Sequence, residues 1–387
     1  MKILQIHNQY AFAGGEDTIS DTEADLLGRA GHEVERVRVR NLERGTAALR
    51  AYAAAPYNVA QYSAMRARVR AFGPDVAHVH NTWFKLTPSI FHALHAERVP
   101  IVMTLQNFRL MCAEGKLYRN GRQCTKCVGR HPWAAVRYSC YRDAIGSSAV
   151  AAATIAVNRR MGTWDLIERF FAPSDFVKRM FVQGGFDGRR IVVKPNVVSD
   201  PGPRLLPPSA SRTLLYVGRL ARDKGPDVLL EAWREAALAA PDLELVIIGD
   251  GPMRAELERR APERVRLLGW VEPAQLHRHM LNARALIFPT QHSENFGRSI
   301  VEAMAAGMPV LASDIATPAD LVGELGQQWL IAPHDVLAWA SGLAGLNDDA
   351  TVDAGGRRGR ELFERKYTLA LGLRRLMEVY EAIRPPR

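Results

Sequence analysis

The chain has 387 residues, of which 47% are apolar and 24% are charged, so it is long enough for two soluble globular domains. No stretch approaches the roughly 18 consecutive apolar residues of a membrane-spanning helix, and the start MKILQIHNQY lacks a basic leader with an apolar core, so we expect a cytoplasmic protein. The net charge of the chain is +10, and residues 1–200 alone carry +11. This uneven charge predicts an anionic partner, and the alternative is that the arginines only lie on the solvated faces of helices.

The first half of the chain alternates short apolar segments with segments long enough for helices. The first apolar segment is followed by a turn-rich loop that ends in Gly14-Gly15, and then by a helical pattern through Arg29. The strands expected here are residues 2–6, 32–39, 75–80 and 99–105. Alternation of this kind is typical of a parallel, doubly wound sheet.

A Pro-rich break at residues 199–212 interrupts the alternation, which then restarts. The strands expected after it are residues 213–217, 243–248, 265–268, 285–289 and 309–312. The sequence therefore predicts an α/β protein with two Rossmann-like, doubly wound domains, residues 1–198 and 212–365, that face each other across a cleft. A last stretch, residues 366–387, has helical spacing of its apolar side chains.

The segment at residues 294–310, ENFGRSIVEAMAAGMPV, carries the strongest functional signal. It follows the apolar run ALIFP, and Gly297 marks a junction between loop and helix. A helix that begins at the carboxyl end of a strand favours a phosphate at its N-terminus. Glu294 and Glu302 would lie near that anion site and would accept hydrogen bonds from sugar hydroxyls. The expected ligand therefore presents phosphate and hydroxyls together.

A second segment, YVGRLARDKGPDVLLEA from Tyr216, places Arg219 and Lys224 on a loop after the first strand of the second domain. Two cations there would hold a diphosphate, and the chain has no Asp-x-Asp motif for a magnesium clamp. We therefore expect catalysis without a metal cofactor. Loss of one such donor typically raises the barrier by about 2.7–4 kcal/mol.

These segments together resemble glycosyltransferase family 4, whose members are retaining enzymes with the GT-B fold. That family pairs a Glu-x7-Glu motif, here Glu294 and Glu302, with an Arg and a Lys after the first strand of the second domain. The resemblance implies that Glu294 contacts the transferred sugar and Glu302 the ribose. It also implies that the C-terminal helix, from residue 366, crosses back to the first domain.

The resemblance assigns further residues to the donor. Gly14-Gly15 matches the family's first glycine loop near the donor phosphates, Gly249 belongs to a second family loop, and Val271 lies in the loop expected at the base. The complete set expected at the donor is Gly14, Gly15, Gln106, Gly249, Val271, Asn295, Phe296, Gly297 and Glu302, with Arg219, Lys224 and Glu294 as the catalytic residues.

Gln106 is a departure from the family, because many members have a His at this position, near the sugar and the leaving phosphate. A glutamine cannot carry a proton at neutral pH, so an acid role for this position is in doubt. His80, at the end of a neighbouring strand, is a candidate for the same cleft, and a hydrogen-bonded strand-end histidine is the alternative. In the family, retention is usually explained by a donor phosphate oxygen that takes the acceptor proton, which requires no protein base.

All four cysteines lie in a predicted insertion at residues 110–142. Cys124 and Cys127 have the spacing of two zinc ligands, with Cys112 and Cys140 on either side. A reducing compartment argues against disulfides. The sequence therefore predicts a structural zinc site, and reduced thiols are the alternative.

Trp83 is a candidate for stacking on an acceptor sugar, and a core or lid role is the alternative. Six arginines are candidates for contact with anionic lipid head groups. They are Arg36, Arg38, Arg40, Arg66, Arg68 and Arg70.

The sequence thus predicts a retaining hexosyltransferase. It would transfer a hexose from a UDP- or GDP-sugar to a glycan or lipid-linked acceptor in surface polysaccharide or lipopolysaccharide synthesis, at the inner face of the plasma membrane. A GT-B epimerase or phosphorylase is the first alternative, although the chain shows no signature for either. A nucleic-acid-binding protein is the second, but no aromatic-basic recognition motif supports it, so we expect no nucleic-acid partner.

Overall fold

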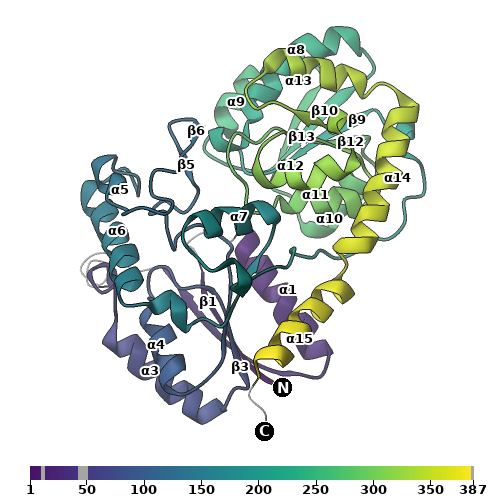
Figure 1. The fold of residues 1–387 in the computed structure, drawn as a ribbon. Helices are drawn as coiled ribbons and strands as arrows, with labels where there is room; N and C mark the ends of the chain where they lie inside the picture. The colour runs from purple at the N-terminus through teal and green to yellow at the C-terminus, as the bar shows by residue number, and fades with distance from the viewer. Residues whose placement is uncertain (10–13, 42–50, 385–387) are drawn as a thin grey trace. The chain divides into compact units, whose positions relative to one another are not determined.

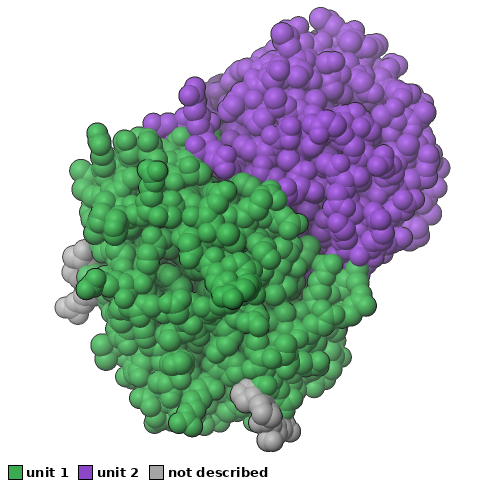
Figure 2. Space-filling view, viewed as in Figure 1, with its two compact units in different colours: residues 1–119, 124–195, 370–387 green, residues 120–123, 196–369 purple. Residues whose placement is uncertain are grey.

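The computed structural model of the chain describes residues 1–9, 14–41 and 51–384. The chain forms two compact units, which Figure 2 shows in different colours. Unit 1 consists of Met1–Arg119, Cys124–Pro195 and Ala370–Arg387, and unit 2 consists of Asn120–Gln123 and Asn196–Leu369.

Unit 1 is built on a six-stranded parallel sheet in the order β2-β1-β3-β4-β7-β8. Figure 1 labels two of its central strands, β1 and β3. Its strands are β1 (Lys2–Gln9), β2 (Glu33–Arg40), β3 (Val76–Asn81), β4 (Ile101–Thr104), β7 (Arg169–Ala172) and β8 (Ile191–Val193). The strands β1, β3 and β4 are almost entirely buried, as expected for parallel strands covered on both faces.

The helices of unit 1 connect these strands in the right order for a doubly wound fold. They are α1 (Gly15–Arg29), α3 (Val59–Phe72), α4 (Ser89–Ala96), α5 (Ala134–Arg137), α6 (Ile145–Arg160) and α7 (Asp175–Gln183). A two-stranded sheet of β5 (Tyr118–Arg119) and β6 (Arg122–Gln123) lies in the segment before α5.

Unit 2 has a second six-stranded parallel sheet, in the order β11-β10-β9-β12-β13-β14. Its strands are β9 (Thr213–Val217), β10 (Glu244–Ile248), β11 (Val265–Gly269), β12 (Ala285–Phe288), β13 (Val310–Ser313) and β14 (Leu330–Ile331). Its helices are α8 (Pro226–Ala239), α9 (Arg254–Arg260), α10 (Pro273–Leu281), α11 (Arg298–Ala305), α12 (Ala316–Val322), α13 (Val336–Gly345) and α14 (Asp349–Lys366).

The last helix, α15 (Leu369–Ile383), packs on the sheet of unit 1. Its Leu376 and Tyr380 are buried in one apolar cluster with Ile3, Leu27 and Val76. Apolar side chains at positions 369, 376 and 380 produce the helical spacing seen in the sequence. No helix among the described residues is long and apolar enough to cross a membrane.

The predicted class, an α/β protein with two Rossmann-like parallel sheets, is confirmed. Strand β9 has the predicted bounds, and β1, β2, β3, β4, β10, β11, β12 and β13 lie within a few residues of theirs. Strands β7, β8 and β14 were absent from the prediction, because each is only two to four residues long and shows no clear pattern.

Candidate functional site

The order of strands in unit 2 creates a switch point between β9 and β12. From β9 the chain continues to β10 and β11 on one side, and it then returns to β12 on the other side of β9. The loops that leave the carboxyl ends of β9 and β12 therefore run in opposite directions, and ligands of doubly wound sheets bind in the crevice between such loops. Arg219 and Lys224 follow β9, and Glu294 follows β12.

Glycines allow these loops to approach each other closely. Gly249 has a φ of 140°, and a Cβ there would lie 1.9 Å from the carbonyl oxygen of Gly218. Gly225 has a φ of 70°, and its Cβ would lie 2.0 Å from the carbonyl oxygen of Pro289. A side chain at either position would push apart the loops that carry the predicted donor residues. Gly249, which was predicted to lie at the donor, thus also has a packing reason to be glycine.

Lys224 and Glu294 form an ion pair at the switch point, with Lys224 Nζ bound to Glu294 Oε1. Their side chains keep 25% and 12% of their surface exposed, so the pair is partly buried but accessible. Two further groups converge on the same oxygen: Thr290 Oγ1 donates at 3.3 Å, and His292 Nε2 lies at 3.4 Å. The structure therefore brings together two of the three predicted catalytic residues, and it adds Thr290 and His292.

Opposing effects set the charge of Glu294. Burial by itself would raise the pKa of this carboxyl, but the positive charge of Lys224 and the neighbouring His292 hold the pKa well below its usual range. Glu294 is therefore ionised near neutral pH, so its oxygens accept hydrogen bonds from hydroxyl groups. Thr290 and His292 were missed because only their short spacing before Glu294 gives a signal in the sequence.

Arg219 lies on the same loop as Lys224, and its side chain is exposed. Its backbone carbonyl accepts a hydrogen bond from the Tyr216 hydroxyl at 3.1 Å. The buried Tyr216 thus holds the start of the loop against the sheet.

Helix α11 begins directly after the loop of Glu294. Gly297 is its N-terminal cap residue, with a φ of 82° that favours glycine. Glu302 lies in the second turn, buried, with its Oε1 2.9 Å from Arg298 Nε. Burial raises the pKa of Glu302, and Arg298 opposes that rise. The two glutamates of the motif therefore have opposite pKa shifts.

The other residues predicted near the donor in unit 2 mostly pack into the protein. Phe296 is buried, with its ring centroid 6.3 Å from that of Tyr367. The carbonyl of Asn295 accepts a hydrogen bond from Thr317 Oγ1 at 3.2 Å. Val271 is half-buried and packs against the core of unit 2.

In unit 1, Gly14 precedes α1, and its N–H donates to Asp17 Oδ2 at 2.8 Å. A Cβ at Gly14 or Gly15 would meet nothing within 4 Å, so the described packing of the chain does not itself require glycine at either position. Gln106 is buried just after β4, and its N–H donates to the Thr104 carbonyl at 3.0 Å.

Trp83 belongs to a buried aromatic cluster with Phe84 and Tyr141, and it also lines a small cavity of unit 1. Its Nε1 donates to the Tyr141 hydroxyl at 3.0 Å, and the Arg109 guanidinium lies 5.5 Å from its ring centroid. These contacts favour the core role for Trp83 over stacking on a sugar.

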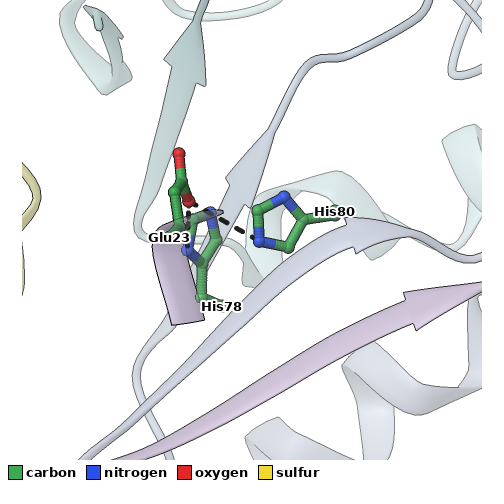
Figure 3. A group of neighbouring side chains, drawn as sticks. All are labelled: Glu23, His78 and His80. Atoms are coloured by element: carbon green, nitrogen blue, oxygen red, sulfur yellow. Dashed lines mark ion pairs between the residues drawn. The ribbon is translucent and has the colours of Figure 1, made fainter. Parts of the chain in front are cut away.

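His80 lies inside a buried polar network that Figure 3 shows in part. Its Nε2 lies 3.7 Å from Glu23 Oε2, and His78 Nδ1 lies 3.6 Å from the same oxygen. Lys194 Nζ binds the other oxygen of Glu23 at 2.7 Å, and the Tyr380 hydroxyl bonds His78 Nδ1 at 2.6 Å. The hydrogen bond of His80 is with Gln5, whose Nε2 lies 3.3 Å from His80 Nε2. His80 is thus a hydrogen-bonded strand-end histidine, which is the alternative that the sequence left open.

Glu23, His78 and His80 form the only group of three or more potential metal ligands within 4.8 Å of one another in the described part of the chain. Burial, together with the positive charge of Lys194, lowers the pKa of His78 to about 3. The positive charge of Lys194, which disfavours a proton on His78, also disfavours a divalent cation between Glu23, His78 and His80. Lys194 therefore supplies the cation of this network, and the site does not favour a metal ion.

The four cysteines are free thiols in the structure and do not belong to that group of potential ligands. Burial, with a smaller effect of the neighbouring thiols of Cys112 and Cys140, raises the pKa of Cys127 to about 11. No three of these thiols lie within 4.8 Å of one another in the described residues, so the structure does not assemble a zinc site. The predicted zinc site therefore rests on the spacing of the cysteines in the sequence.

The arginines predicted to face lipid head groups are mostly paired with carboxylates. Arg36 and Arg38 pair with Asp21, Arg66 and Arg70 with Glu97, and Arg68 with Glu35. Five of the six predicted arginines thus share three carboxylates, so these ion pairs balance about half of the positive charge of the set.

Two family models match the chain, one in each half. The model described as Glycosyl transferase 4-like domain matches residues 12–197, and the model described as Glycosyl transferases group 1 matches residues 203–357. Each half of the chain therefore resembles a glycosyltransferase domain. The gap between the two matches lies close to residue 196, where unit 2 takes over from unit 1.

Named relatives of this chain match it over part of their length. The 2-deoxystreptamine glucosyltransferase of Streptomyces kanamyceticus is 35% identical over 40% of this chain and 42% of that protein. A phosphatidyl-myo-inositol mannosyltransferase of Mycolicibacterium smegmatis is 31% identical over 46% of each chain. The chain thus matches less than half the length of these two relatives.

Solved structures match over nearly the whole chain. HepE of Anabaena, in complex with UDP, has a TM-score of 0.68 at 16% identity and covers 99% of this chain and 100% of its own. The lipopolysaccharide outer core galactosyltransferase WaaB has a TM-score of 0.64 at 17% identity, with 99% of each chain covered. At this identity the similarity shows the fold.

Proposed function

We propose that this chain is a retaining hexosyltransferase that uses a UDP- or GDP-sugar. The ion pair of Lys224 and Glu294 at the switch point of unit 2 carries the proposal. It places a fixed cation and an ionised carboxylate side by side at the position where doubly wound sheets bind nucleotides. A nucleotide sugar presents the matching groups, a diphosphate and several hydroxyls.

In this proposal Lys224 and Arg219 neutralise the charge that develops on the departing diphosphate. An ammonium group has three donors, so Lys224 can hold Glu294 and a phosphate oxygen together. Pre-positioned donors of this kind stabilise charge in the transition state without reorganisation. The start of α11 adds backbone N–H groups near the same loop. These groups would act on the leaving group without a catalytic metal ion.

Glu294 orients the transferred sugar, and Glu302 accepts a hydrogen bond from the ribose. Gly14, Gly15, Gln106 and Gly249 belong to the loops proposed to surround the donor. No side chain is proposed as the base, because Gln106 cannot take a proton, so a phosphate oxygen of the donor takes the proton of the acceptor hydroxyl. That step agrees with retention of the anomeric configuration.

We propose a glycan or lipid-linked acceptor in surface polysaccharide or lipopolysaccharide synthesis, reached from the cytoplasmic side of the plasma membrane. One relative supports a lipid acceptor, because it is named for a mannosyl transfer that involves phosphatidyl-myo-inositol. Structures of HepE contain UDP and UDP-glucose, and they support the proposed donor.

Release of the nucleotide tests the proposed function. Purified protein incubated with UDP- and GDP-sugars and no acceptor should slowly release UDP or GDP, because water replaces the acceptor. A phosphorylase would leave the nucleotide sugars intact and would release a sugar phosphate only from a glycan with inorganic phosphate. A changed sugar on an intact nucleotide would indicate an epimerase. No reaction with any nucleotide sugar, combined with tight binding of nucleic acid, would contradict the proposal.

The structural zinc site at Cys112, Cys124, Cys127 and Cys140 is a separate proposal. Elemental analysis of purified protein should find near one zinc per chain, and a double Cys124→Ser and Cys127→Ser variant should lose it. A folded wild-type protein without zinc would contradict this proposal and would leave the transferase proposal unaffected.

A further inference from the structure

The segment that contains α5 and α6 carries positive charge that the described residues leave unpaired. Residues 124–161 include six Lys or Arg and one Asp. None of these six cations forms an ion pair with a carboxylate among the described residues. This contrasts with the arginines of β2 and α3, five of which form ion pairs with Asp21, Glu35 or Glu97.

Large apolar side chains are exposed among these cations. Trp133, which precedes α5, is 53% exposed, and Met161, which follows α6, is 47% exposed. Val157 is also exposed, and it shares one face of α6 with Arg160 and Met161 because the three are spaced at i, i+3 and i+4.

A hydrogen bond connects the two ends of this region. Arg159 Nη1 donates to the carbonyl of Arg130 at 2.9 Å, and this brings the chain before α5 beside the end of α6. Helices α5 and α6 pack against each other, and they lie side by side in Figure 1. We name the resulting surface the basic-aromatic patch, and it consists of Arg130, Trp133, Val157, Arg160 and Met161.

Each part of the patch matches a different layer of a lipid bilayer. Tryptophan rings prefer the level of the head groups, where one side of the ring is apolar and the other is wet. Arginine stems lie along apolar surface and hold their charge among anionic head groups. A soluble polyanion would use only the charges and would leave Trp133 and Met161 in water.

We propose that the basic-aromatic patch docks unit 1 on an anionic lipid bilayer. The proposal deepens the proposed function, because it names the surface that would bring the enzyme to a lipid-linked acceptor. It assigns the contact to α5 and α6 and not to the arginines of β2 and α3.

Co-sedimentation with vesicles tests the patch. The full chain should bind vesicles of phosphatidylcholine mixed with phosphatidylglycerol at low salt, and it should bind pure phosphatidylcholine much more weakly. A double Arg130→Gln and Arg160→Gln variant should bind the anionic vesicles on the order of 30-fold more weakly, since each cation near an anionic surface contributes about a factor of five. The matched control, Arg66→Gln with Arg68→Gln, removes the same charge from paired positions and should bind nearly as well as wild type.

The Trp133→Ala variant distinguishes binding of a bilayer from binding of a soluble polyanion. It leaves the charge unchanged, so it should weaken vesicle binding and leave binding of soluble polyphosphate unchanged. Equal vesicle binding by Trp133→Ala and wild type, equal loss in the two arginine pairs, or no binding at low salt would each overturn the proposal. Release of nucleotide without acceptor should be normal in the patch variants, so failure of docking is distinguishable from failure of the transferase proposal.

Discussion

Two lysine–glutamate ion pairs, Lys194–Glu23 in unit 1 and Lys224–Glu294 in unit 2, differ mainly in exposure. In unit 1, Lys194 and Glu23 have side chains only 1% and 2% exposed, and the surrounding His78, His80 and Tyr380 are also buried. In unit 2, Lys224 and Glu294 are 25% and 12% exposed and follow two strands at the switch point. The buried Lys194–Glu23 pair is therefore suited to stabilise the fold, whereas the partly exposed Lys224–Glu294 pair is accessible to a ligand.

The buried pair should matter most for stability. Removal of one partner of a buried ion pair leaves an uncompensated charge, which typically lowers the free energy of unfolding by about 3–5 kcal/mol. We expect a loss of this size for Lys194→Met in urea unfolding. Lys366→Met is a matched control, because Lys366 pairs with Glu324 on the surface, and it should lose less than about 1 kcal/mol. Equal losses in the two variants would show that burial of the Lys194 pair is unimportant.

The partly exposed Lys224–Glu294 pair should matter most for activity. Lys224→Ala should lower turnover of a nucleotide sugar by a factor on the order of 10²–10³, because it removes a donor to the leaving diphosphate. Its stability should change far less than that of Lys194→Met, since the site is partly solvated. Arg222→Ala removes an exposed cation from the same loop and serves as the control, with turnover close to wild type. Near-normal turnover of Lys224→Ala would reject its assignment.

The contact of α15 with the buried network should have a smaller effect. Tyr380→Phe removes the hydroxyl that bonds His78 Nδ1 and keeps the ring, so we expect a loss of about 0.5–1.5 kcal/mol in unfolding free energy. Hydrogen exchange should also become faster in α15. An unchanged stability and exchange rate would mean that the ring alone fixes this helix.

The buried histidines should make stability depend on pH, with the smallest effect near neutrality. The pKa of His78 falls to about 3 in the folded protein, from about 6.5 in the unfolded chain, because of burial and Lys194. As pH falls below 6.5 the unfolded chain takes up a proton that the folded protein resists, so the free energy of unfolding should decrease toward pH 3. His78→Asn should flatten this dependence in urea unfolding measured across that range. A wild-type profile with no decline would contradict the network.

The sequence predicted the units of the fold better than the contacts inside them. Strands such as β9 and β13 are continuous apolar runs, so composition and the flanking turns locate them. The Lys224–Glu294 pair was accessible to prediction, because both residues follow strands whose ends meet at one edge of a sheet. Glu23 and Lys194 are 171 positions apart, and no local pattern connects them. The pairing of Arg36 and Arg66 with carboxylates was hidden for the same reason.

The most direct test is stabilisation of the folded protein by nucleotide sugars. A panel of UDP- and GDP-sugars should include at least one ligand that raises the melting temperature of wild type, since a ligand at 100 times its dissociation constant adds about 2.7 kcal/mol. The account predicts that this shift is largely lost in Lys224→Ala and kept in Arg222→Ala. An equal shift in wild type and Lys224→Ala, or no shift with any member of the panel, would contradict the assignment of the Lys224–Glu294 pair to the donor.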